Sequence, residues 1–101
     1  MDVNPHDGVF GALASLPRRQ MLSILAQTAL STAELAQRFG MSAPAVSRHL
    51  AVLARAGLVS GERQGQRVLY RLNRDLLLGA LARMADEVDG PLRRAPPREA
   101  I

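Results

Sequence analysis

Two short helices joined by a tight turn are the feature that most constrains how this chain of 101 residues folds. Ser31 and Glu34 form a capping-box pattern, in which a Ser caps a helix and the Glu three residues later bonds back to the cap. Gly40 can take the left-handed conformation that ends this helix. Ser42 predicts the start of a second helix, and Gly57 marks its end. Two helices joined by a short turn that contains Gly are typical of a helix-turn-helix motif.

The residues that follow predict a two-stranded hairpin. Apolar runs of strand character lie at 58–60 and 67–72, and two glycines and several polar residues separate them. A hairpin directly after a helix-turn-helix motif is a wing. We therefore predict a mainly α chain with a small β-hairpin (α+β), namely a winged helix-turn-helix of about five helices and a two-stranded wing.

The rest of the sequence predicts further helices within one domain, at residues 1–90. Val9, Phe10 and Leu13 form an apolar stripe on a first helix, and Pro17 suits the first position of a second helix. Asn73 predicts the cap of a final helix. The expected segments are a first helix at 7–16, the helix-turn-helix at 31–56, the wing at 58–72, a final helix at 74–89 and a flexible tail at 91–101.

Positive charge is concentrated in the middle of the chain. All 13 basic residues are Arg. Residues 18–74 hold nine arginines against two acidic residues, a local charge of +7, whereas the flanking segments together hold four arginines against seven acidic residues. A basic centre favours a phosphate-binding surface, and double-stranded DNA is the partner that we expect. A solvated basic surface without a partner is the alternative.

Several protein classes are excluded or disfavoured by composition. The absence of Cys excludes disulfides and thiolate metal sites. No apolar run reaches the roughly 18 residues that a membrane span needs, and the polar start does not resemble a signal peptide, so we expect a cytoplasmic protein without a membrane partner. His6 and His49 are accompanied by no acid–base pair, phosphate loop or nucleophile motif, so we expect no enzymatic activity.

The second helix of the motif has one apolar face and one small, basic face. Val46, Leu50 and Leu53 share a face and are expected in the core. On the opposite face, small residues would let the helix approach DNA closely, Arg48 could reach a guanine edge or a phosphate, and Arg55 would reach only the backbone. The expected DNA-contacting residues are Ser42, Ala43, Pro44, Ser47, Arg48, His49 and Arg55 in this helix and Arg63, Gln64, Gln66 and Arg67 at the hairpin tip.

Two of these assignments have alternatives. His49 lies on a flank with Ala45 and Val52, where it could be a packed structural histidine. Polar residues also collect at hairpin tips that contact nothing.

The first and last helices are more apolar than a core of this size requires. We expect them to form a homodimer interface, which would present two reading helices to a palindromic site. A role in the core alone is the alternative. The expected interface residues are Val9, Phe10, Leu13, Leu77, Leu81, Met84 and Val88.

The stretch from residue 16 to residue 72 resembles the ArsR/SmtB family of bacterial winged helix-turn-helix repressors. The runs SAPAVSRHLAVLARAGLV and GQRVLYRL are similar to the recognition helix and the wing of that family. The resemblance implies a homodimeric transcription regulator on an inverted-repeat operator, whose DNA affinity an effector changes. It also places Ser42, Ser47, Arg48 and His49 at the DNA-contacting positions of the family.

The chain departs from that family at its usual metal sites. The helix before the turn reads ELAQRF, without a Cys-x-Cys-type motif, and the final helix contains no His. We therefore expect no metal and no cofactor. The closer resemblance is to members without a metal site, which act as autorepressors or respond to a partner protein.

Three other functions remain open from the sequence. A nickel- or zinc-responsive regulator could combine nitrogen and oxygen ligands, which such metals accept; the candidates are His6, Asp2, Asp7, Asp86, Glu87 and Asp89. A protein-docking module could use the apolar terminal helices alone. An architectural protein could coat DNA without reading its sequence.

Overall fold

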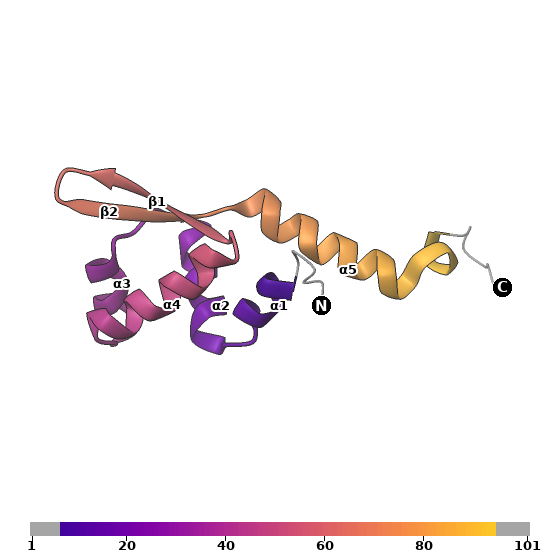
Figure 1. Ribbon diagram of the computed structural model, residues 1–101, viewed down its shortest axis with the longest axis horizontal. Coiled ribbons are helices and arrows are strands. Elements are labelled where there is room, and N and C mark those ends of the chain that lie inside the picture. The colour runs from indigo at the N-terminus through magenta and orange to yellow at the C-terminus, as the bar shows by residue number, and fades with distance from the viewer. Residues whose placement is uncertain (1–6, 95–101) are drawn as a thin grey trace.

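The computed structural model describes residues 7–94, with side chains for residues 8–90. Its elements are α1 (Asp7–Leu13), α2 (Leu16–Leu25), α3 (Thr32–Phe39), α4 (Ala43–Arg55), β1 (Val59–Gln64), β2 (Arg67–Leu72) and α5 (Arg74–Arg94). Helices α1 to α4 form a body with the hairpin along one side, and α5 extends away from it (Figure 1). The molecule measures 59 × 36 × 23 Å. The predicted winged helix-turn-helix fold is confirmed.

The ends of α3 have the predicted caps. The Ser31 hydroxyl accepts a hydrogen bond from the Glu34 backbone N–H at 3.2 Å, and a Glu34 carboxylate oxygen accepts one from the Ser31 N–H at 2.8 Å. Gly40 has φ 62° and ψ 36°, and the next N–H, of Met41, bonds back to the Ala36 carbonyl at 3.0 Å. This left-handed cap turns the chain sharply toward α4.

Helix α4 ends at a second glycine cap. Gly57 has φ 81°, the Gly57 N–H bonds to the Ala54 carbonyl at 2.9 Å, and the Leu58 N–H bonds to the Leu53 carbonyl at 2.9 Å. These two bonds satisfy carbonyls that the last turn of a helix leaves free. A Cβ at position 57 would lie 2.9 Å from Leu76 Cδ1, so Gly also permits the close approach of α5.

The wing is an antiparallel pair in which Val59 faces Leu72 and Gln64 faces Arg67. The two-residue loop starts at Gly65, with φ 66°, which is the position that a tight hairpin turn of this kind requires to be Gly. Leu30 adds an isolated bridge to Tyr70, with backbone hydrogen bonds of 3.1 and 2.8 Å. The hairpin is thereby attached to the segment that leads into α3.

Three helix boundaries differ from the sequence prediction. Helix α1 ends at Leu13 instead of residue 16, because Ser15 is the cap of α2 and accepts a bond from the Arg18 N–H at 3.4 Å. Helix α2 starts at Leu16, one residue before Pro17. The predicted stop at Gly90 is a kink, with φ 53° and ψ −149°, after which residues 91–94 are helical rather than a flexible tail. Residues 95–101 lie outside the described residues.

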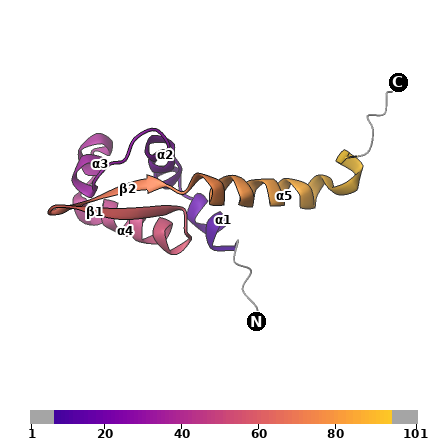
Figure 2. The same cartoon turned by 90° about the horizontal axis from the view of Figure 1, so that it is seen from above.

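One apolar core lies between the helices and the base of the hairpin. Its largest fully buried side chains are those of Val9, Met21, Leu35, Val46, Leu53 and Leu58. Within residues 74–90 of α5, only Ala80 is fully buried, and the helix leaves the body as it proceeds (Figure 2). The core therefore holds α4 and the wing in place and leaves most of α5 uncovered.

Candidate nucleic-acid interface and terminal-helix surface

The exposed face of α4 consists of small, polar and basic side chains. Val46, Leu50 and Leu53 are at most 2% exposed, so the apolar face of the helix is buried as its periodicity predicts. The exposed side chains of the helix and its cap are those of Ser42, Ala43, Pro44, Ser47, Arg48, Ala51, Ala54 and Arg55. Short side chains leave the helix surface open to close approach, and a helix of this kind fits the width of a DNA major groove.

Ser42 caps the start of α4 and also presents a hydroxyl group there that can bind DNA. Its Oγ accepts a hydrogen bond from the Ala45 N–H at 3.2 Å. The hydroxyl proton is then available as a donor to a phosphate or a base edge. The aligned peptide dipoles also make the N-terminal end of a helix favourable for anions.

Four of the sequence-predicted residues lie exposed at the tip of the wing: Arg63, Gln64, Gln66 and Arg67. Among the described residues Arg63 has no acidic partner. Arg67 does have one, because its Nη1 lies 3.3 Å from Oε2 of Glu34 in α3. The same carboxylate therefore caps α3 through one oxygen and holds the wing through the other.

The pKa of Glu34 reflects this double role. The hydrogen bond from the Ser31 backbone is the main cause that lowers the pKa of Glu34 below its usual value, with smaller contributions from the Ser31 hydroxyl and from Arg67. Desolvation acts in the opposite direction. From the sequence, Glu34 was predicted only as part of the cap. No local pattern could have revealed the ion pair, since its partners are 33 positions apart.

His49 is half-buried and lies against Arg18 of α2. The Arg18 Nη1 is 3.5 Å from His49 Nδ1. Burial is the main cause that lowers the pKa of His49, and the charges of Arg18 and Arg48 lower it further. No pattern in the sequence pointed to Arg18 as a partner of His49. The environment of His49 is the packed one that the sequence left open as the alternative to an exposed contact residue.

The exposed apolar residues of α5 form a second candidate surface, away from α4. Leu81 is 42% exposed, Met84 43% and Val88 70%, and Leu78, which is 52% exposed, widens the same stripe. These values mark an apolar surface that no other part of the described chain covers.

The predicted interface includes one residue that does not belong to this surface. Val9 is 2% exposed and lies in the core of the protomer, so the prediction that it belongs to a dimer interface is wrong. The apolar stripe on α1 was correctly predicted, but periodicity does not tell which neighbour covers each residue of a stripe. Phe10, Leu13 and Leu77 are partly exposed and remain available to a partner.

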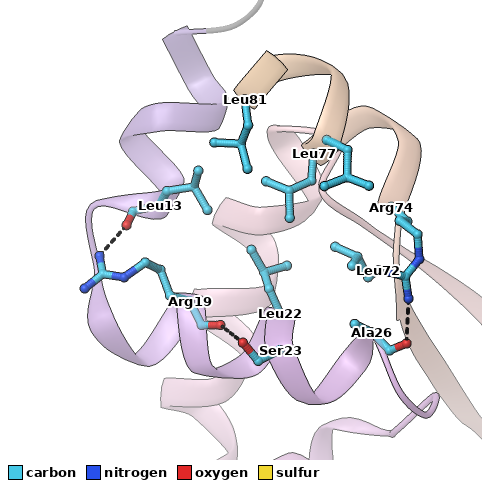
Figure 3. Close-up of a pocket in the computed structure, with 10 residues that line it drawn as sticks. Leu13, Arg19, Leu22, Ser23, Ala26, Leu72, Arg74, Leu77 and Leu81 are labelled. Carbon is cyan, nitrogen blue, oxygen red and sulfur yellow. Dashed lines mark hydrogen bonds between the residues drawn. The ribbon is translucent and has the colours of Figure 1, made fainter. Parts of the chain in front are cut away.

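A groove of about 400 Å³ lies where α5 leaves the body (Figure 3). Leu13, Leu22, Leu77 and Leu81 contribute apolar side chains to it. Its two arginines bond to backbone carbonyls instead of facing an anion: Arg19 donates to Leu13 O at 2.6 Å and Arg74 to Ala26 O at 3.0 Å. The groove is therefore predominantly apolar and continuous with the stripe on α5.

Within residues 7–94, no three His, Asp or Glu side chains come together in an arrangement that could hold a metal ion. Asp2 and His6 lie outside the described residues, and the side chain of Asp7 is not described. None of the described helices has the length and apolar character needed to cross a membrane.

Residues 17–60, which contain α3, α4 and all but the first residue of α2, match the family model described as "Bacterial regulatory protein, arsR family". The transcriptional repressor SdpR of Bacillus subtilis is 34% identical over 71 residues, which are 70% of this chain and 79% of SdpR. The transcriptional activator HlyU of Vibrio cholerae is 42% identical over 62 residues, which are 61% of this chain but only 57% of HlyU. The chain thus spans little more than half the length of that second relative.

A similar solved structure is the homodimeric winged helix-turn-helix DNA-binding domain of a possible regulator from Mycobacterium bovis. It is 29% identical, covers 85% of this chain and 81% of its own, and superimposes with a TM-score of 0.71. The similarity to known proteins is therefore not confined to the helix-turn-helix motif, because the three-dimensional arrangement of most of the chain is also similar.

Proposed function

Because this chain belongs to the ArsR family of bacterial regulatory proteins, we propose that it is a homodimeric repressor that reads an inverted-repeat operator with α4. Membership of this family makes the chain a DNA-binding transcription regulator and not an enzyme. The further assignments, of the reading residues, the dimer surface and the direction of regulation, are our proposal.

The observation that carries the proposal is the two-sided character of α4. Its apolar face is anchored in the core, and its opposite face is exposed, small and basic. In this reading Ser42, Ser47 and Arg48 approach base edges, and Arg48 makes a bidentate contact with a guanine. Arg55 lies nearly two turns further along and contacts phosphate, which adds affinity without reading sequence.

The wing supplies contacts at the side of the same site. Arg63, Gln64 and Gln66 are exposed at its tip and lie within reach of a backbone or a minor groove. Arg67 serves first as the link between the wing and Glu34, and its remaining donors are available to phosphate. This pairing makes the wing a positioned element rather than a free loop.

Dimerisation uses the apolar surface of the terminal helices. Leu81, Met84 and Val88 on α5, with Phe10 and Leu13 on α1, supply side chains that a second copy can cover. The apolar groove at the base of α5 lies beside this stripe and provides a concave surface for it. Two-fold symmetry then presents two α4 helices to half-sites about 34 Å apart, one turn of DNA.

A binding titration tests this function. The protein is titrated against the DNA upstream of its own gene, with excess unrelated competitor DNA, at two salt concentrations, and with and without nickel or zinc. We expect saturable binding that survives the competitor and weakens steeply with salt, because each neutralised phosphate releases counterions. Binding that disappears with the competitor would instead support the architectural alternative.

Repression is preferred to activation, and the relatives differ on this point. SdpR is a named repressor and HlyU a named activator. A dimer whose contacts all lie along the DNA acts most simply by occupying promoter sequence. Transcription from the bound promoter with purified polymerase distinguishes the two: repression predicts that transcript falls as the operator is filled, whereas a rise would show an activator.

A further inference from the structure

We propose that Arg18 is a positioning residue that ties the end of α1 to the DNA-reading helix α4 and fixes the hydrogen-bonding state of His49. The inference rests on the proposed function, since it assigns α4 to DNA and α1 to the dimer. It adds a physical connection between those two surfaces within one protomer.

The geometry of the Arg18 guanidinium is the basis of the proposal. Nε donates to the Ala12 carbonyl at 2.7 Å, Nη2 donates to the Gly11 carbonyl at 3.2 Å, and Nη1 lies 3.5 Å from His49 Nδ1. The last carbonyls of a helix lack partners within it and favour a cation. One planar group at the start of α2 therefore joins the end of α1 to the middle of α4.

The contact with Arg18 determines which ring nitrogen of His49 carries the proton. A guanidinium group can only donate hydrogen bonds, so Nδ1 of His49 must accept and the proton lies on Nε2. The imidazole is then neutral. Burial and the positive charges of Arg18 on α2 and Arg48 on α4 lower the pKa of His49, in agreement with this state.

The residues at each end of the connection give it a role in DNA binding. Gly11 and Ala12 lie between Phe10 and Leu13, which are partly exposed on the proposed dimer surface. His49 directly follows Arg48, the proposed base-reading residue. A shift of α1 when the dimer forms or rearranges would therefore move α4. The neutral His49 presents its Nε2–H to the DNA as a hydrogen-bond donor, instead of adding a second positive charge beside Arg48.

The state of His49 can be measured without DNA, which separates this inference from the proposed function. The imidazole ¹⁵N shifts of the full chain are followed by NMR against pH, with His49→Gln used to distinguish His49 from His6. We expect the Nε2–H tautomer in the wild type. Arg18→Lys should raise the pKa of His49 and mix the tautomers, because an ammonium group cannot hold both carbonyls and the ring at once.

Arg38→Ala is the control for this titration. Arg38 is exposed in the last turn of α3 and makes no contact with His49, so removal of its charge should leave the tautomer unchanged. An Nδ1–H tautomer in the wild type would overturn the inference, as would a His49 titration that Arg18→Lys and Arg38→Ala leave equally unaffected.

The effect on DNA is measured as the ratio of operator affinity to affinity for unrelated DNA. Arg18→Ala and Arg18→Lys should each lower this ratio about tenfold, as expected for a residue that couples two sites. Arg38→Ala, which removes an exposed charge outside the Arg18 contacts, should leave the ratio unchanged. If Arg18→Lys keeps the wild-type ratio, a positive charge at position 18 is enough for operator preference, and the positioning role proposed for Arg18 is wrong. If the wild type itself shows no operator preference, the proposed function is wrong, and the NMR titration still decides the Arg18–His49 contact.

Discussion

Arg48 and Arg55 lie on the same exposed face of α4 but have different proposed roles, which makes them a matched pair. Arg48→Ala should reduce operator binding by about 1–3 kcal/mol and relax the preference at one or two base pairs, because it removes a bidentate contact to a base. Arg55→Ala should weaken binding to all sequences alike and reduce the salt dependence. Competition titrations with single-base operator variants measure both effects. If Arg48→Ala leaves operator affinity unchanged, the reading face of α4 has been misassigned.

The lowered pKa of His49 predicts how stability depends on pH. The folded protein binds a proton at His49 less readily than the unfolded chain, whose His has a pKa of about 6.5. Unfolding therefore takes up a proton, and stability should fall as the pH decreases from about 7 to 5. Glu34, whose pKa is lowered by its hydrogen bond from the Ser31 backbone, adds a loss of stability in the same direction at the acid end of this range. Urea unfolding at several pH values should show this slope, and His49→Gln should reduce it; an unchanged slope would mean that other groups cause it.

Each short element is defined by local chemistry, and the sequence predicted these elements well. Ser31, Glu34 and Gly40 act within a few positions of one another, so the ends of α3 could be identified directly. Ser42 and Gly57 likewise identified the start and the end of α4. The end of α1 was placed too late because Ser15 could belong to either helix, and only the observed hydrogen bond assigns it to α2.

Contacts between elements could not be predicted in this way. The Arg18–His49 and Glu34–Arg67 contacts join residues 31 and 33 positions apart, and no periodic pattern links them. Val9 was misassigned for a related reason, since its apolar character was correct but the neighbour that covers it was not known. Candidate DNA residues on one helix could therefore be identified, whereas the residues that position that helix could not.

Glu34→Gln tests the link between the wing and α3. The amide oxygen of Gln can still accept from the Ser31 N–H and preserve the cap, but the charge that pairs with Arg67 is lost. We expect little change in the unfolding midpoint, greater mobility of residues 63–67 and a several-fold loss of operator affinity. Backbone ¹⁵N relaxation measures that mobility. A wing as rigid as in the wild type would show that Glu34 does not hold it.

The whole molecule is asymmetric, with a compact reading body and an α5 whose apolar stripe is largely exposed (Figure 1). Leu81→Asp should convert the dimer to monomers and weaken operator binding, because an unpaired charge buried at an interface costs about 3–5 kcal/mol. Arg83→Asp, which introduces the same side chain on the opposite face of α5, is the control and should leave the dimer intact. Sedimentation equilibrium measures both. A Leu81→Asp protein that remains dimeric would rule out the α5 interface.

Hydroxyl-radical footprinting on the bound operator tests whether two α4 helices of a symmetric dimer read two half-sites. We expect two protected regions related by a dyad, with centres about 34 Å apart or a multiple of that distance. Arg48→Ala should weaken both regions equally. A single protected region, or protection spread evenly along the fragment, would contradict the symmetric reading dimer.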